Sequence, residues 1–200
     1  QLVVLSGDAG IGKSRLAGEI ASYAHLTHDA KVLSGHCVPY GADVWWPIAE
    51  AIRGACGLNA DDSAPAARKK LTEVVSARAA GAAADEVTRV VNGLLYLLGH
   101  VGDLADVDPG RARDDSARSA RILFQHIARE KPLVMVLADL QWADELVLHM
   151  LERLLMRLRT LAFIVVATAL PDARPHALID AARGNLALVG IEPLDELAVR

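Results

Sequence analysis

The chain has 200 residues, and 52% of them are apolar, which is enough to bury the core of a single domain. Its 21 Lys and Arg are outnumbered by 25 Asp and Glu, giving a net charge of −4, and only 4% of residues are aromatic; this argues against a nucleic-acid-binding surface. Apolar runs such as residues 133–138 are too short to span a membrane, and two isolated cysteines fit a reducing cytoplasm. We therefore expect a cytoplasmic chain that contacts neither membrane nor nucleic acid.

The first predicted strand, residues 2–5, leads directly into the sequence GDAGIGKS, which fits the phosphate-binding pattern G-x-x-x-x-G-K-[ST]. Apolar residues at helical spacing from Leu16 to Ala21 predict a helix immediately after it. A strand, a glycine-rich loop and a helix in this order are the setting of a P-loop, whereas a glycine-rich turn with an incidental lysine needs no such flanks. The motif therefore predicts a nucleoside triphosphate as the ligand.

Each residue type in this loop has a physical role. Glycines let successive backbone N–H groups turn toward phosphate oxygens, and the N-terminus of the following helix adds positive potential. Lys13 would contact the β- and γ-phosphates, and the hydroxyl of Ser14 would bind Mg²⁺. Arg15 follows the motif and either contacts phosphate or is a solvated helix residue. With ATP and Mg²⁺ as cofactors, the predicted nucleotide-binding residues are Gly7, Asp8, Ala9, Gly10, Ile11, Gly12, Lys13, Ser14 and Arg15.

The middle of the chain is predicted to be mainly helical. A short strand over residues 31–35 and a turn-rich stretch precede a helix over residues 46–56. From about residue 59 to about residue 130 (59–130) the chain reads as a helical insertion, in which apolar residues recur at spacings of three and four over residues 87–98. We therefore expect one domain, residues 1–200, that carries this insertion.

The second half of the chain returns to short apolar runs. Residues 133–137, 162–167 and 186–189 predict three more strands, and residues 144–158 predict a helix between the first two of them. Strands that alternate with helices imply a parallel sheet with helices on both faces. The predicted fold class is α/β: a P-loop NTPase three-layer αβα sandwich with a mostly parallel, five-stranded sheet and a helical insertion.

An acidic residue follows the apolar strand at residues 133–137. Triphosphate sites hold the Mg²⁺ water shell with a carboxylate at the end of a strand that neighbours the P-loop. Asp139 is the candidate for this Walker B role, as a metal ligand together with Ser14 and as the catalytic carboxylate; the alternative is a turn aspartate. Asp144 is expected to cap the next helix instead.

Two longer segments carry a specific resemblance. The segments GDAGIGKSRL and VLADLQWADE resemble the AAA-type ATPase domain of the STAND signalling NTPases, the nucleotide switches of large ATP-binding LuxR-type regulators and bacterial multidomain adenylate cyclases. Residues 35–41 and 45–53 are similar to that group too. The resemblance implies a switch domain in a signal-transduction or transcription-regulatory protein. Its implied partners are nucleotide, other domains of the same polypeptide and, in a nucleotide-dependent homo-oligomer, further copies of the chain.

The chain departs from that family at two positions. The family's acidic strand usually ends in two acidic residues, but here the first is Ala138, which leaves Asp139 alone. After the fourth strand the family commonly carries an arginine near the γ-phosphate, where this chain has Leu170 and, further on, Arg174. Because such groups stabilise charge that develops in the transition state, the departures imply intact nucleotide binding with slow hydrolysis.

Two other functions stay open at this stage. The first is a non-hydrolysing interaction scaffold, which fits the two departures. The second is a P-loop small-molecule kinase, which would need an acceptor pocket and a basic lid, and the sequence shows no basic lid segment. The family also has an adenine-pocket segment before the first strand and a lid after the last, and we expect both to be absent from residues 1–200. His36 has no partner that the sequence reveals and is expected to be structural.

Overall fold

The computed structural model describes residues 1–39, 44–79, 81, 83–100, 107–171 and 185–193. Strands and helices alternate at both ends of the chain, and helices fill its middle. The strands are β1 (Leu2–Ser6), β2 (Lys31–His36), β3 (Leu133–Ala138), β4 (Phe163–Ala169) and β5 (Leu186–Gly190). The helices are α1 (Lys13–His28), α2 (Trp46–Cys56), α3 (Ala64–Arg78), α4 (Ala84–Leu97), α5 (Pro109–Glu130) and α6 (Glu145–Arg157), with a short 3-10 helix, η2, at Leu140–Trp142.

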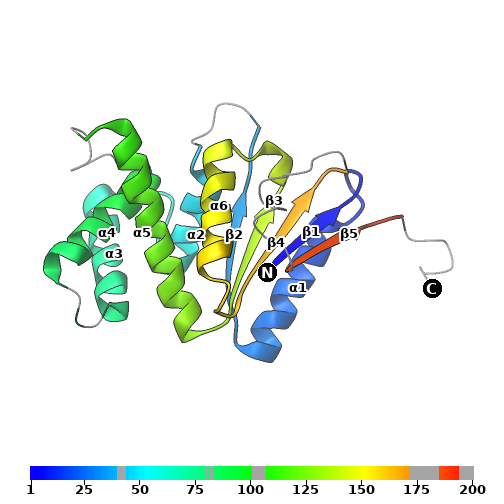
Figure 1. Cartoon of the computed structure of the whole chain (residues 1–200), viewed down its shortest axis with the longest axis horizontal. Coiled ribbons are helices and arrows are strands. Elements are labelled where there is room, and N and C mark those ends of the chain that lie inside the picture. Colours follow the sequence, from blue (N-terminus) through cyan, green and yellow to red (C-terminus); the bar gives the residue numbers. More distant parts are fainter. Residues whose placement is uncertain (40–43, 80, 82, 101–106, 172–184, 194–200) are drawn as a thin grey trace.

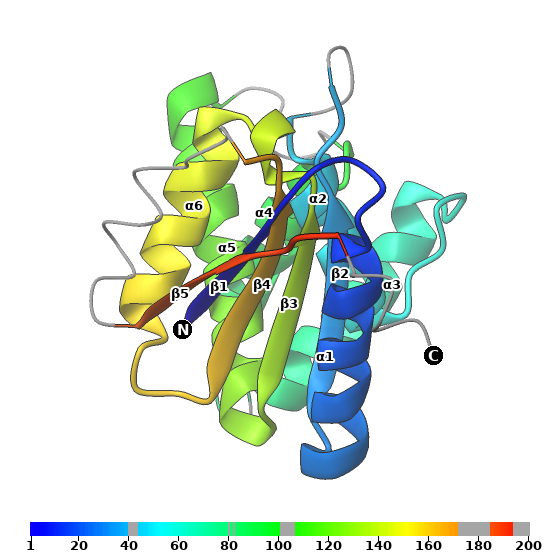
Figure 2. The same cartoon turned by 90° about the vertical axis from the view of Figure 1, so that its right-hand side faces the viewer.

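The five described strands are all parallel and lie in the order β2-β3-β4-β1-β5 (Figure 2). This arrangement confirms the predicted α/β fold class. β4 lies between β1 and β3, so the strand before the glycine-rich loop and the strand before Asp139 are next-nearest neighbours. Because parallel strands end at the same edge of a sheet, the segments that follow Ser6, His36, Ala138 and Ala169 meet along that edge.

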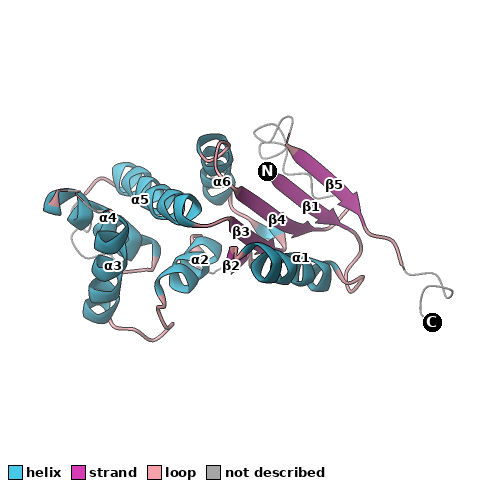
Figure 3. Cartoon of the chain, turned by 90° about the horizontal axis from the view of Figure 1, so that it is seen from below, coloured by secondary structure: helices cyan, strands magenta, loops and turns pink. Residues whose placement is uncertain are grey.

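Helices cover the two faces of this sheet unequally. Among the described helices, α1 alone packs on one face (Figure 3). On that face Ala17 and Ala21 share a hydrophobic cluster with Leu5, Val134 and Val166 of the strands. α2 and α6 pack on the opposite face, within the larger hydrophobic core. The asymmetry follows from right-handed connections, because the crossing from β1 to β2 runs in one direction across the sheet and the later crossings run in the other.

The helices α3, α4 and α5 form a group that extends sideways past β2 (Figure 1). Apolar side chains of α4 such as Leu94 share one core with Leu123 and Phe124 of α5. The two helices approach closely at Gly93, where a Cβ would collide with the hydroxyl of Ser119. These helices occupy the region in which the sequence predicts an insertion, and they leave the carboxyl edge of the sheet uncovered.

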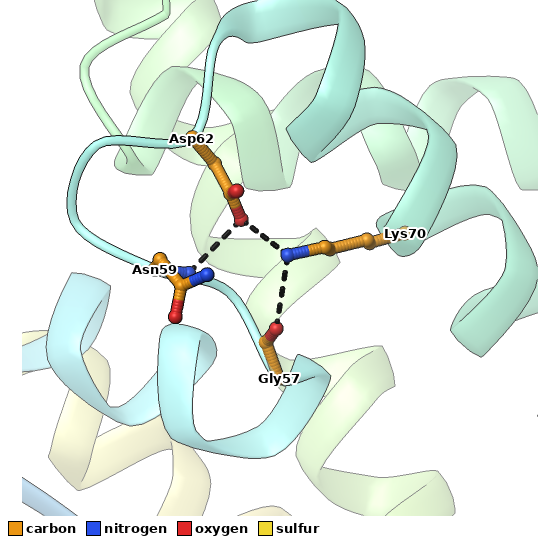
Figure 4. Close-up of polar contacts among 4 residues, drawn as sticks. All are labelled: Gly57, Asn59, Asp62 and Lys70. Atoms are coloured by element: carbon orange, nitrogen blue, oxygen red, sulfur yellow. Dashed lines mark hydrogen bonds and ion pairs between the residues drawn. The ribbon is translucent and has the colours of Figure 1, made fainter.

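One aspartate holds the turn between α2 and α3 (Figure 4). The Asp62 carboxylate accepts hydrogen bonds from the Lys70 ammonium at 2.7 Å and from the Asn59 N–H at 2.9 Å. Lys70 also donates to the carbonyl of Gly57, the residue that ends α2, at 3.3 Å. The bond from Lys70, followed by that from Asn59, holds the pKa of Asp62 below its ordinary value.

Candidate functional site

The loop between β1 and α1 has a conformation that requires glycine at three positions. Gly10 and Gly12 have φ angles of 79° and 100°, a region that residues with a Cβ rarely adopt. Gly7 lies so close to Ile191, just after β5, that a Cβ would be 2.8 Å from the Ile191 carbonyl oxygen. The loop ends where α1 begins at Lys13, so its backbone turns directly into a helix N-terminus.

Lys13 is buried, and its ammonium lies against the loop. Its Nζ donates to the carbonyl oxygens of Gly7 at 2.9 Å and Asp8 at 2.8 Å, while 8% of the residue is exposed. An ammonium has three donors, so one remains for another acceptor. This cation lies at the N-terminus of α1, where unpaired N–H groups and the helix dipole also favour negative charge. The loop is therefore built to bind an anion.

Asp139, directly after β3, is joined to the end of β4 by a short polar network. Its backbone is left-handed, with a φ of 57°, and its N–H donates to the hydroxyl of Thr168 on β4 at 3.0 Å. Asp139 Oδ1 accepts from the side-chain amide of Gln141 at 3.2 Å. The carbonyl oxygen of that amide accepts from the N–H of Leu170 at 3.3 Å. These hydrogen bonds therefore connect the Asp139 carboxylate, through the Gln141 side chain, to the segment after β4.

A groove of about 680 Å³ runs between α1 and the strands β2 and β3. At the carboxyl edge of the sheet it is lined by Ser14 from α1 and by Asp139, together with Ala138, Thr168 and His36. The two predicted metal ligands, distant in sequence, thus share one cavity. The far end of the groove is lined by His25, Asp29 and Lys131.

The chemistry of these two side chains fits a hard cation. A hydroxyl and a carboxylate are oxygen donors, which Mg²⁺ prefers, and Mg²⁺ usually keeps several waters rather than a full set of protein ligands. In the part of the chain that the structure describes, no three His, Cys, Asp or Glu side chains gather into a metal site. Cation binding here would therefore use Ser14, Asp139, water and phosphate oxygens.

Other residues singled out in the sequence are placed differently. Arg15 is exposed on α1 and does not line the groove, so its contact with phosphate stays a prediction. Asp144 caps α6 as expected, because its Oδ1 accepts from the N–H of Leu146 at 2.9 Å. Arg174 lies outside the described residues.

His36, expected to be a structural residue without a partner, lies in the groove and has one. Its backbone N–H donates to Glu50 Oε2 at 2.7 Å, and its ring Nδ1 is 3.2 Å from the same oxygen. Burial raises the pKa of the adjacent Cys37 thiol to about 12, and the charges of Asp139 and Glu50 add to the shift. Sequence reasoning missed this pair because Glu50 belongs to α2, where nothing marks it as the partner of a residue on β2.

A sequence model of the AAA ATPase domain matches residues 1–166. The chain belongs to the AAA ATPase domain family. A protein of Rhizobium meliloti (strain 1021), described as uncharacterized, is 28% identical over 97% of this chain, and the chain spans 18% of the length of that protein.

An AAA ATPase domain is a nucleotide-binding domain, and the P-loop of this one is complete from Gly7 to Ser14. Nucleotide binding is therefore the function on which the fold, the motif and the family agree. None of the helices in the described ranges has both the length and the hydrophobicity that crossing a membrane requires.

Proposed function

We propose that this AAA ATPase domain is an ATP- and Mg²⁺-dependent switch of a multidomain bacterial signalling or transcription-regulatory protein, and that it hydrolyses ATP slowly. The observation that carries the proposal is the groove that joins Ser14 to Asp139. In this groove Ala138 contributes a methyl group at the position where the STAND family, which the sequence resembles, usually has a carboxylate. The regulatory context rests on the resemblance of the sequence to the STAND NTPases. The length of the Rhizobium protein, of which the chain spans 18%, supports a multidomain setting.

Nucleotide binding rests on the loop and on the start of α1. Loop N–H groups and the helix N-terminus favour phosphate, and Lys13 would donate its remaining hydrogen to a phosphate oxygen while Gly7 and Asp8 hold the ammonium. Mg²⁺ would be held by the Ser14 hydroxyl and, through water, by Asp139, and it would neutralise charge on the β- and γ-phosphates. Each of these groups is present in the chain, so we expect its contacts with the phosphates to be kept.

Hydrolysis needs further groups, which stabilise charge in the transition state and orient the attacking water. The strand β3 ends in Ala138 and Asp139, so one carboxylate would have to serve both the cation and the water. After β4, Leu170 carries no charge, and its N–H is already bound to Gln141. These features support slow turnover.

The polar network around Asp139 supplies the switch. A ligand shifts a conformational equilibrium only as far as its affinities for the two states differ, and ATP and ADP differ at the γ-phosphate. Contacts that the γ-phosphate makes with Asp139 through the cation and its water would be passed through Gln141 to Leu170, where the chain leaves the sheet. We expect the two nucleotides to favour different arrangements of this segment and of the domains or copies that contact it.

Calorimetric titration of the chain with ATP and ADP, with and without Mg²⁺, tests the binding. Lys13→Ala should weaken ATP affinity at least about tenfold, since a hydrogen bond to a charged group contributes about 1.5–3 kcal/mol. Lys69→Ala, which changes an exposed lysine on α3, should bind like the wild type. A wild-type chain that binds neither nucleotide would overturn the proposal.

Phosphate release under multiple turnover separates the alternatives. A slow switch should release phosphate well below about one per second, the low end of ordinary enzyme turnover. Several turnovers per second would overturn the claim of slow hydrolysis. A small-molecule kinase would transfer phosphate to an added acceptor, and a scaffold would bind ATP and never cleave it.

A further inference from the structure

His36 and Glu50 form an imidazole–carboxylate pair at the carboxyl end of β2. Glu50 Oε2 is 2.7 Å from the His36 backbone nitrogen and 3.2 Å from its ring Nδ1. The two elements that carry the pair are held together tightly, because Gly35 lies against the backbone of Pro47 and a Cβ there would collide with the Pro47 carbonyl. The carboxylate is thus fixed behind the imidazole by packing of α2 on β2.

The hydrogen bonds determine which ring nitrogen carries the proton. An ionised carboxylate can only accept, so Nδ1 of the neutral imidazole donates to Glu50 and Nε2 keeps its lone pair. Among the described residues, Nε2 of His36 has no hydrogen-bond partner, and 61% of the side chain is exposed. A carboxylate that orients an imidazole whose second nitrogen is free to accept is the arrangement of a general base.

The strand register places this imidazole beside Ala138, the position where the STAND family, which the sequence resembles, usually has the first of two acidic residues. His36 is the register partner of Ala138, and partners in adjacent parallel strands project from the same face of the sheet. Both residues line the groove that contains Ser14 and Asp139. On this face of the sheet, the side chain that β3 places opposite His36 is the methyl group of Ala138.

A purely structural role for Glu50 explains its contact with the backbone of His36 but not its contact with the imidazole ring. β2 is an edge strand, and the carboxylate satisfies the backbone N–H of His36. That role needs no imidazole and does not account for the second contact from Nδ1. His36 and Asp139 line the same groove, so the imidazole and the candidate metal ligand face one cavity.

We propose that His36 is the base that activates water in the slow hydrolysis, with Glu50 as its positioning residue, an inference that rests on the proposed function. The water oxygen attacks the γ-phosphorus, and its proton goes to Nε2 of His36. The bond between the γ-phosphorus and the bridging oxygen breaks, and its electron pair leaves with ADP. Asp139 then binds the water shell of the cation, and His36 activates the attacking water. Without His36, the Asp139 carboxylate alone would have to fill both roles.

Single-turnover hydrolysis, with protein in excess over γ-labelled ATP, tests the assignment. His36→Ala should slow phosphate release about 100-fold, the low end of general-base contributions. Glu50→Gln, which keeps an oxygen to accept from the His36 N–H, should slow it about tenfold, whereas a purely structural Glu50 would tolerate the change. ATP affinity should stay within about twofold of the wild type in both variants, because only the chemical step is affected.

His149→Ala is the matched control. His149 is exposed on α6 and does not line the groove. This variant should release phosphate at the wild-type rate. Equal losses in the His149 and His36 variants would overturn the inference, and so would wild-type release by His36→Ala.

ATP binding and phosphate release by the wild-type chain distinguish an error in this inference from an error in the proposed function. A wild-type chain that binds ATP but releases no phosphate refutes the base and leaves nucleotide binding intact. A wild-type chain that does not bind ATP refutes the proposed function itself. Melting curves identify a variant that has lost its fold, and if His36→Ala is one, the Glu50→Gln result decides the question.

Discussion

The backbone N–H of Asp139 donates to the hydroxyl of Thr168 across 3.0 Å, and this bond joins the carboxyl end of β3 to that of β4. Thr168 is 1% exposed, and Thr168→Val keeps its shape while removing the acceptor. We expect a loss of about 1 kcal/mol in the free energy of unfolding, measured in urea. Thr88→Val, which alters an exposed hydroxyl on α4, should change stability by less than about 0.5 kcal/mol. Equal losses of stability in the Thr168 and Thr88 variants would show that the bond between Asp139 and Thr168 does not stabilise the fold.

The contact between β2 and α2 predicts opposite results for two glycines. Gly35→Ala forces a Cβ into the Pro47 carbonyl, and we expect a destabilisation of at least about 1–3 kcal/mol. Gly54→Ala, in the interior of α2, meets nothing nearer than Leu33 Cδ2 at 3.8 Å, so helix propensity should stabilise the chain by up to about 1 kcal/mol. Denaturant unfolding of both variants measures these changes. A stable Gly35→Ala variant would show that α2 can move away from the sheet.

The two cysteines should be unreactive in the folded chain. Burial raises the pKa of Cys37 to about 12 and that of Cys56 to about 11. Because the thiolate is the reactive form, a disulfide reagent at about pH 8 should label neither residue until the chain unfolds. The labelling rate with and without urea measures this, and Cys56→Ser identifies which thiol reacts. Rapid labelling of the native chain would contradict the burial.

Restoring a carboxylate at the end of β3 should raise turnover. Ala138→Asp adds an oxygen ligand to the groove that contains Ser14, and we expect Mg²⁺-dependent phosphate release to rise about tenfold. Ala138→Asn has nearly the same shape without the charge and should give no such rise. Similar rates for the Asp and Asn variants would show that Ala138 is not what limits hydrolysis.

Asp62 should contribute stability that depends on pH. Its folded-state pKa is lowered from the ordinary 3.8 by the hydrogen bonds from Lys70 and Asn59, so folding favours the charged form. This contribution is complete above the unfolded pKa and is lost as the pH falls through the folded one. Asp62→Asn should therefore melt below the wild type at pH 7, and the difference should shrink as the pH falls below about 4. Asp61→Asn, which changes an exposed neighbouring carboxylate, should melt with the wild type at pH 7.

Contiguous patterns made the fold class and the phosphate-binding loop predictable. The strand, the glycine-rich loop and the helix between Leu2 and His28 follow each other directly, so hydrophobic spacing and turn chemistry were sufficient. Each predicted strand is present. β1, β2, β3 and β5 each run one residue further than predicted, and β4 covers Phe163–Ala169 where residues 162–167 were predicted. Local spacing also identified Asp144 as a helix cap.

Contacts between segments that are distant in the sequence could not be predicted from such contiguous patterns. The position of β4 between β1 and β3 depends on packing, so the bond from Asp139 to Thr168 had no sequence signal. The partnership of His36 with Glu50 requires α2 to lie directly on β2, a consequence of one glycine whose role appears only in three dimensions. A histidine at a predicted strand end, opposite a missing carboxylate, is the signal that would have pointed to it.

The place of β1 in the sheet also has a consequence for how the protein is made. Both neighbours of β1, β4 and β5, come from the last part of the chain, and β2 pairs with β3 across the whole helical group. During synthesis the glycine-rich loop leaves the ribosome before β2, β3, β4 and β5, yet β1 has no neighbouring strand to pair with until β4, which begins at Phe163, follows. The helices α3 to α5 can meanwhile form local contacts, which close faster than non-local strand pairs. ATP affinity would therefore report completion of the entire sheet rather than formation of the loop that contacts the phosphates.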